Sequence, residues 1–71
     1  DIRINAICPG NVATPLVVSL VEDLSVLATK HAINRLGTPQ EVANGVMYLA
    51  SDLSSFSTGS LLEVDGGWNA I

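Results

Sequence analysis

Few side chains in this sequence can act as a nucleophile, a general base or a metal ligand. There is one cysteine, Cys8, and one histidine, His31, and the carboxylates do not cluster around them. A thiol beside an imidazole is a catalytic pair in some enzymes, but this spacing also fits a buried thiol and an imidazole at a helix end. No zinc-ligand spacing and no serine elbow occur. We therefore predict no catalytic residue and no metal site within this chain.

The stretch best suited to ligand binding is the loop Pro9-Gly10-Asn11-Val12-Ala13-Thr14. It follows a short isoleucine-rich run, residues 2–8, which is predicted to be a strand. Open α/β sheets bind ligands at the carboxyl ends of their parallel strands, Gly10 permits close approach, and Thr14 offers a hydroxyl. The same pattern fits an ordinary strand-to-helix turn, so the residues alone leave both interpretations open. No Gly-x-Gly-x-x-Gly loop for phosphate occurs.

Two segments have the apolar periodicity of helices. The first runs from Leu16 to about Lys30 and is apolar beyond a single stripe, so either another part of the protein covers it or it closes over an apolar ligand. The second runs from Pro39 to Asp52 and begins with Thr38 and Glu41 at the spacing of a capping box. Its predicted apolar stripe consists of Val42, Val46, Leu49, Ala50 and Leu53.

Gly45 lies in the middle of this second helix. Glycine there costs about 1 kcal/mol relative to alanine, which predicts the close approach of another backbone.

A second strand is predicted from Ser60 to Val64, followed by a turn at Asp65-Gly66-Gly67. The order strand-helix-helix-strand indicates an α/β fold, with two parallel strands joined by a crossover connection. Two such strands usually need further strands beside them, so the chain is expected to be one end of a larger doubly wound parallel sheet. Trp68 either lines a pocket or anchors the tail.

The composition excludes several classes of protein. Of 71 residues, 48% are hydrophobic and three are cationic, and the net charge is -4, which argues against a nucleic-acid surface or a polybasic membrane anchor. The apolar runs are shorter than the ~20 residues that span a bilayer. One cysteine allows no internal disulfide, and no signal peptide pattern occurs, so we expect a cytoplasmic protein. Since the chain begins inside a predicted strand, we expect a fragment.

Several motifs in fixed order resemble one family. They are residues 2–10 (IRINAICPG) with Val12 and Thr14, 35–39 (RLGTP), 41–43 (EVA), 49–52 (LASD), 58–59 (TG) and 64–67 (VDGG). In this spacing they resemble the carboxyl-terminal part of a short-chain dehydrogenase/reductase, a family of NAD(P)-dependent oxidoreductases with a Rossmann-type fold. The resemblance covers essentially the whole chain.

The resemblance implies roles for three segments of a single Rossmann-type domain. Residues 1–15 would supply a strand and the nicotinamide-side loop, in which the Val12 backbone binds the carboxamide and the Thr14 hydroxyl contacts the carboxamide or pyrophosphate. Residues 16–37 would form a substrate lid. Residues 38–71 would supply the capped helix, the last strand and the tail, and the chain would pair as a dimer or tetramer through the helix Pro39–Asp52 and the strand Ser60–Val64. The implied cofactor-binding residues are Pro9, Gly10, Asn11, Val12 and Thr14, and the lid residues are Leu16, Val17, Leu20 and Val21.

The sequence departs from the family at the site of chemistry. The family uses a tyrosine, with a lysine four residues later, to exchange a proton with an alcohol or ketone substrate. The single tyrosine here, Tyr48, is followed four residues later by Asp52, so it cannot take that role. We therefore expect the isolated chain to be inactive. A truncated, non-catalytic oligomerisation module and a chain that barely folds alone remain alternatives. The apolar lid favours a hydrophobic or alicyclic substrate.

Overall fold

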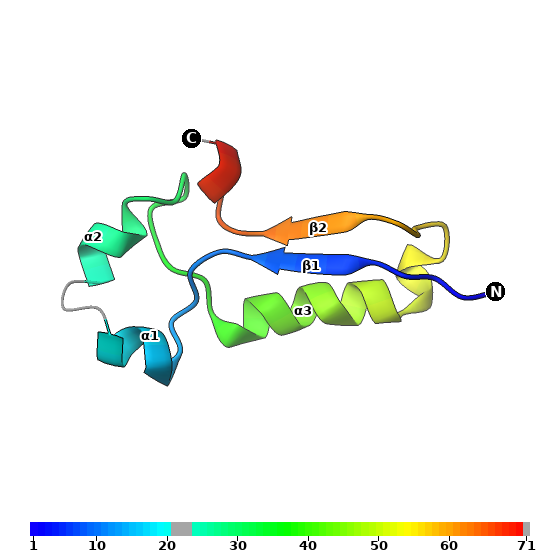
Figure 1. The fold of residues 1–71 in the computed structure, drawn as a ribbon, viewed down its shortest axis with the longest axis horizontal. Helices are drawn as coiled ribbons and strands as arrows, with labels where there is room; N and C mark the ends of the chain where they lie inside the picture. The colour runs from blue at the N-terminus through cyan, green and yellow to red at the C-terminus, as the bar shows by residue number, and fades with distance from the viewer. Residues whose placement is uncertain (21–23, 71) are drawn as a thin grey trace.

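The computed structural model describes residues 1–20 and 24–70. In chain order the elements are β1 (Ala6–Pro9), α1 (Pro15–Leu20), α2 (Leu24–Ala28), α3 (Pro39–Ala50), the 3-10 helix η1 (Asp52–Ser54), β2 (Leu61–Val64) and the 3-10 helix η2 (Trp68–Ala70). The strands point toward α1 and α2, and α3 lies along the sheet (Figure 1). The predicted α/β class is confirmed.

The two strands pair in parallel, as predicted, with Ala6 opposite Leu61 and Pro9 opposite Val64. β1 is shorter than the predicted strand over residues 2–8 because the opposite segment bends at Gly59, where φ is 71°. Pairing continues there through separate bonds: the Gly59 N–H donates to the Ile4 carbonyl at 2.7 Å, and the Ile4 N–H donates to Thr58 Oγ1 at 3.2 Å.

The capping box at the start of α3 is confirmed. The Glu41 N–H donates to Thr38 Oγ1 at 3.1 Å, and the Thr38 N–H donates to Glu41 Oε1 at 2.9 Å. The helix ends at Ala50 rather than Asp52, because Ser51 is extended and its side chain caps η1 instead.

Gly45 faces the sheet, and this corrects the predicted approach of another backbone. A Cβ at this position would lie 2.8 Å from Ile7 Cδ1 and 3.1 Å from Val64 Cγ2, so its close neighbours are strand side chains.

The apolar stripe predicted for this helix is narrower than expected. Val46 on α3 is 47% exposed, and Leu53, which lies in η1 after the end of α3, is 82% exposed.

Arg3 ties the end of α3 to the segment before β1. Its Nη1 donates to the Ser54 carbonyl and to Ser54 Oγ, both at 2.9 Å, and its Nη2 donates to the Ser51 carbonyl at 3.3 Å. Carbonyls at a helix end have no partner within the helix, so a guanidinium with several donors satisfies them well.

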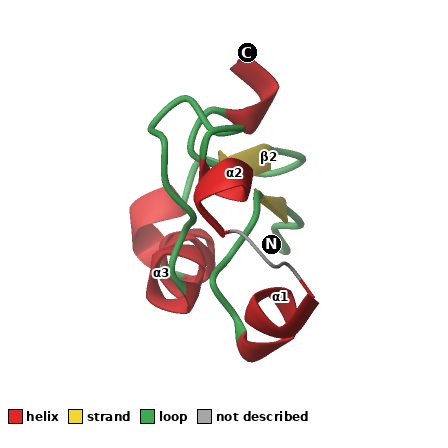
Figure 2. Ribbon diagram, turned by 90° about the vertical axis from the view of Figure 1, so that its left-hand side faces the viewer, coloured by secondary structure: helices red, strands yellow, loops and turns green. Residues whose placement is uncertain are grey.

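One long helix was predicted over residues 16–30; the structure describes α1 and α2 in this range, and residues 21–23 between them lie outside the described residues. α1 begins one residue earlier, at Pro15, and ends at Leu20, and α2 ends at Ala28. The chain tightens after α2 because the Lys30 and His31 N–H groups bond three residues back, to the Leu27 and Ala28 carbonyls. α1 and α2 lie beyond the carboxyl ends of the strands, as Figures 1 and 2 both show.

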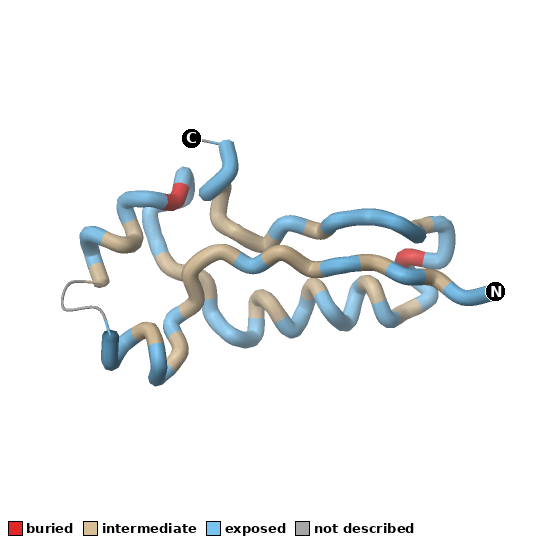
Figure 3. The backbone as a smooth tube through the Cα atoms, viewed as in Figure 1, coloured by how far each residue is buried: buried red, intermediate tan, exposed pale blue. Residues whose placement is uncertain are grey.

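Burial is shallow throughout the described chain (Figure 3). Among the described residues no hydrophobic residue is buried, and the buried residues are His31 and Ser54. The radius of gyration is 13.9 Å, against about 11 Å for a compact chain of this length. α3 covers the sheet face that carries Ile7, whereas Leu61 on the other face is 71% exposed. No helix in the described part is long and apolar enough to cross a membrane.

Candidate functional site

The carboxyl ends of the two strands bring the Pro9-Gly10 loop against the turn that follows β2. The Gly10 N–H donates to the Val64 carbonyl at 3.0 Å and so extends the parallel ladder by one bond. A Cβ on Gly10 would lie 2.8 Å from Asp65 Cα and 3.0 Å from the Asp65 carbonyl oxygen. Two backbones can approach this closely only where one of them carries no side chain.

The loop beyond Gly10 is held on both sides of Val12. The Asn11 N–H donates to His31 Nε2 at 3.2 Å, and the Asn11 carbonyl accepts from the Gly37 N–H at 3.0 Å. The Ala13 N–H donates to the Gly37 carbonyl at 2.9 Å. In the described part of the chain, the Val12 N–H between them donates to no acceptor. The loop therefore presents one unused backbone donor from a fixed position.

Thr14 forms the start of α1. Its Oγ1 accepts from the Val17 N–H at 3.3 Å, and its carbonyl accepts from the Val18 N–H at 2.9 Å. This is the geometry of an N-cap followed by proline at the first helical position. Thr14 therefore caps the turn that leads from the strand into α1. The hydroxyl oxygen is used, and within residues 1–20 and 24–70 the hydroxyl proton has no acceptor.

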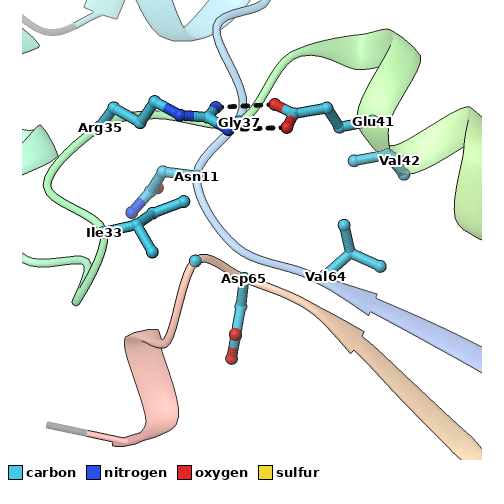
Figure 4. Close-up of a pocket in the computed structure, with 9 residues that line it drawn as sticks. Asn11, Ile33, Arg35, Gly37, Glu41, Val42, Val64 and Asp65 are labelled. Atoms are coloured by element: carbon cyan, nitrogen blue, oxygen red, sulfur yellow. Dashed lines mark hydrogen bonds and ion pairs between the residues drawn. The ribbon is translucent and has the colours of Figure 1, made fainter.

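Residues 33–37, which hold the loop through Gly37, pack on the first turn of α3 around a cavity of about 50 Å³ (Figure 4). Water occupies about 30 Å³ per molecule in the liquid, so this space is too small for a substrate. The cavity is lined by Asn11, Ile33, Arg35, Gly37, Glu41, Val42, Val64, Asp65 and Gly66. It is a small gap in the packing between the loop, α3 and the end of β2.

Arg35 and Glu41, which line this small cavity, form an ion pair. Arg35 Nη1 and Nη2 donate to Glu41 Oε1 and Oε2, both at 2.8 Å. The hydrogen bond from Arg35, followed by that from the Thr38 N–H, lowers the pKa of Glu41 to about 2 from its ordinary 4.5. The same hydrogen bond, with the charge of Glu41, raises the pKa of Arg35. The pair fixes the chain next to Gly37, which in turn holds residues 11 and 13.

A larger, open cavity of about 370 Å³ lies at the carboxyl ends of the strands. Its size falls within the range of small-molecule sites. It is lined by Cys8, Pro9, Gly10, Asn11, Asp65, Trp68 and Asn69. Three of the predicted cofactor-binding residues therefore share one hollow with the turn after β2, and Trp68 does line a pocket.

The turn at Asp65 is shaped by two glycines, as predicted. Gly66 has φ of 59° and Gly67 has φ of 84°, a region that residues with a side chain rarely adopt. The Asp65 carboxylate accepts from the Gly67 N–H at 3.0 Å and from the Asn69 N–H at 3.4 Å. This carboxylate therefore stabilises the turn and the start of η2.

Three of the predicted lid residues, Leu16, Val17 and Leu20, lie on α1 beside the loop. Leu16 is 67% exposed and Leu20 is 74% exposed, while Val17 is half-buried. Val21 lies outside the described residues. Tyr48 is on α3 and lines neither of the two cavities described above. In the described ranges, no three His, Cys, Asp or Glu side chains are grouped to hold a metal ion.

Sequence reasoning missed the part that His31 takes in this site. Its ring is 3% exposed and contacts Trp68, with 5.2 Å between the ring centroids and 57° between the planes. The hydrogen bond joins residues 20 positions apart. No local spacing rule predicts such a contact, and the one available signal was that the only histidine stands near the end of a predicted helix. Gly37 was noticed only as part of a motif.

Comparisons with known proteins agree on one family. The sequence model described as enoyl-(acyl carrier protein) reductase matches residues 1–69. Cis-4-hydroxycyclohexanecarboxylate dehydrogenase from Sinomonas cyclohexanicum is 46% identical over 71 residues, which are 99% of this chain and 28% of that protein. NADP-dependent (R)-specific alcohol dehydrogenase from Lentilactobacillus kefiri is 42% identical over 72 residues, 99% of this chain and 29% of that protein.

The structural comparison gives the same result. A crystal structure of a short-chain type dehydrogenase/reductase from Mycobacterium marinum superimposes with a TM-score of 0.86 at 37% identity, and covers 99% of this chain and 28% of that one. This chain thus spans between a quarter and a third of the length of the relatives named here.

Proposed function

The chain belongs to the short-chain dehydrogenase/reductase family, and we propose that it is the carboxyl-terminal segment of an NAD(P)-dependent enzyme that interconverts an alcohol and a ketone. In this proposal the chain supplies the loop beside the nicotinamide, a substrate lid and a surface for oligomerisation. When bound, NAD(P) supplies the hydride chemistry. The residues of this chain bind and orient, and those that transfer the proton to or from substrate lie elsewhere in the polypeptide.

The main support for this proposal is the Val12 N–H, which donates to no acceptor in the described part of the chain. It stands in a loop whose neighbouring groups, the Asn11 and Ala13 N–H, are both engaged by other segments. A fixed donor costs little further ordering when it meets a ligand, which favours recognition of a carboxamide oxygen. Gly10 lets the loop lie directly against the Asp65 backbone, which fixes the position of the loop, and the Thr14 hydroxyl proton is a second available donor.

The substrate class follows from the lid. Leu16, Val18 and Leu20 are between 51% and 74% exposed on α1, next to the loop. Burying such side chains against a ligand is favourable by about 25 cal/mol per Å² of apolar surface, so we propose a hydrophobic or alicyclic alcohol or ketone. The similarity to an enzyme named for a hydroxycyclohexanecarboxylate supports this choice.

The oligomer surface would be the outer face of α3 with the outer edge of β2. Met47 is 66% exposed and Tyr48 is 41% exposed on that helix, and β2 pairs on one edge with β1. A second copy of the chain would bury both features, as a dimer or within a tetramer. A non-catalytic oligomerisation module built on this same surface is the rival function.

Titration with NADH and NADPH separates the two functions. The full polypeptide that carries this chain should quench or enhance the cofactor's fluorescence with saturation, and it should oxidise cyclohexanol derivatives. The isolated 71-residue chain should do neither. If the full polypeptide sediments as an oligomer but binds neither cofactor, the result would support the rival function. Comparing the affinities for NADH and NADPH decides between the two cofactors.

A further inference from the structure

His31 is placed between the two halves of the candidate site. On one side its Nε2 accepts the Asn11 N–H at 3.2 Å, and on the other its ring contacts Trp68. A Cβ on Gly66 would lie 3.4 Å from His31 Cβ, so the turn after β2 packs against it as well. The ring is 3% exposed, which leaves it little freedom to rotate.

The hydrogen bond uses one nitrogen of this ring as an acceptor. A nitrogen that accepts from an N–H carries no proton itself, so in this arrangement the ring proton is on Nδ1. Nδ1 is buried and has no partner among the described residues.

Among the described residues, no charged side chain is hydrogen-bonded to the His31 ring. Asp65, on the turn after β2, accepts from two backbone N–H groups, and Lys30 directly precedes His31. Cys8 in β1 lines the neighbouring cavity as a free cysteine. Within the described ranges, Arg35 and Glu41 form the one ion pair.

We propose that His31 is a positioning residue for cofactor binding: its neutral ring holds the Asn11 backbone, so that the Val12 N–H meets the nicotinamide side of the dinucleotide. This inference rests on the proposed function. Its consequence is that dinucleotide affinity falls when this acceptor is removed, although His31 touches neither cofactor nor substrate.

Two substitutions at this position separate hydrogen bonding from packing. In the full polypeptide, His31→Phe keeps a ring against Trp68 but removes the acceptor, whereas His31→Gln restores an acceptor as a side-chain carbonyl oxygen. One hydrogen bond is worth about 0.5–1.5 kcal/mol, so His31→Phe should weaken NADH or NADPH binding about 2- to 12-fold. His31→Gln should stay within about twofold of wild type. Equal affinities for the two variants would overturn the proposal.

A further readout distinguishes this inference from the proposed function. Hydrogen exchange of the Asn11 amide should be slow in wild type and in His31→Gln, and fast in His31→Phe. If wild type binds no dinucleotide, the proposed function fails and exchange still decides whether His31 holds the loop. Equal exchange rates in His31→Phe and wild type would contradict the proposal.

Discussion

Replacing Gly10 with alanine tests the contact on which the whole site depends. The new Cβ would lie 2.8 Å from Asp65 Cα, whereas carbon atoms in contact are normally about 3.5–4.0 Å apart. The shortfall is about 0.7–1.2 Å. The obstructing atoms belong to the Asp65 backbone, so no side-chain rotation relieves the clash. The loop and the turn after β2 must therefore move apart.

The cost follows from two contributions. Inserting a methyl group into a packed contact costs about 1–3 kcal/mol. The separation also stretches the Gly10 N–H bond to the Val64 carbonyl beyond its present 3.0 Å, and losing a hydrogen bond costs about 0.5–1.5 kcal/mol. We expect Gly10→Ala to lower the free energy of unfolding of the full polypeptide by about 1.5–4.5 kcal/mol and to weaken dinucleotide binding.

Gly37→Ala is the matched control for this prediction. A Cβ there would meet the Asn11 carbonyl oxygen at 3.7 Å and a Val12 methyl at 4.0 Å, which are ordinary contacts, and it would leave the backbone hydrogen bonds in place. Its free energy of unfolding should stay within about 1 kcal/mol of wild type. Urea denaturation of both variants, with dinucleotide affinity measured in parallel, checks the prediction. If Gly10→Ala is as stable as Gly37→Ala, the reasoning from the Asp65 contact is wrong.

Two further predictions concern parts of the chain that support the site. Arg3→Met keeps an unbranched side chain but removes the donors to the Ser54 and Ser51 carbonyls, so it should lower the free energy of unfolding by about 1.5–3 kcal/mol; an effect in urea denaturation no larger than that of Arg3→Lys would contradict it. Glu41 has its pKa lowered from 4.5 to about 2 in the folded chain, so its contribution to stability is complete above pH 4.5 and is lost as pH falls toward 2. Glu41→Gln should remove this part of the acid dependence, and high salt should weaken it because the pair is exposed; unchanged acid denaturation of Glu41→Gln would show that the pair has no such effect.

Local sequence signals predicted the elements whose formation depends on neighbouring residues. The capping box at Thr38 and the glycine turn after β2 are set by side chains within a few positions of each other, and both are present. The helical segment after Thr14 was predicted to reach Lys30, whereas α2 ends at Ala28, because apolar periodicity does not register where an N–H begins to bond three residues back instead of four. β1 was also predicted too long, since its extent depends on a partner segment more than 50 positions away.

The candidate site was also predictable only where its features depend on neighbouring residues. Proline and glycine after a strand indicated the loop, because these residues restrict or free the backbone locally. The hydrogen bonds that hold Asn11 and Ala13 come from His31 and Gly37, and they depend on how distant segments pack. Likewise Gly45 was expected to meet a backbone, while its actual neighbours are Ile7 and Val64 of the sheet. Composition alone does not identify the partner in such contacts.

The central claim is that the Val12 N–H binds the nicotinamide side of the dinucleotide. A backbone ester at that position tests it most directly. Incorporating α-hydroxyisovaleric acid in place of Val12 in the full polypeptide removes this single donor and keeps the side chain. Val12→Ala, which keeps the donor and shortens the side chain, is the control. We predict that the ester weakens NADH or NADPH binding about 2- to 12-fold while the alanine variant stays within about twofold of wild type. An ester variant that binds the dinucleotide as tightly as wild type would contradict the assignment of this loop to the nicotinamide.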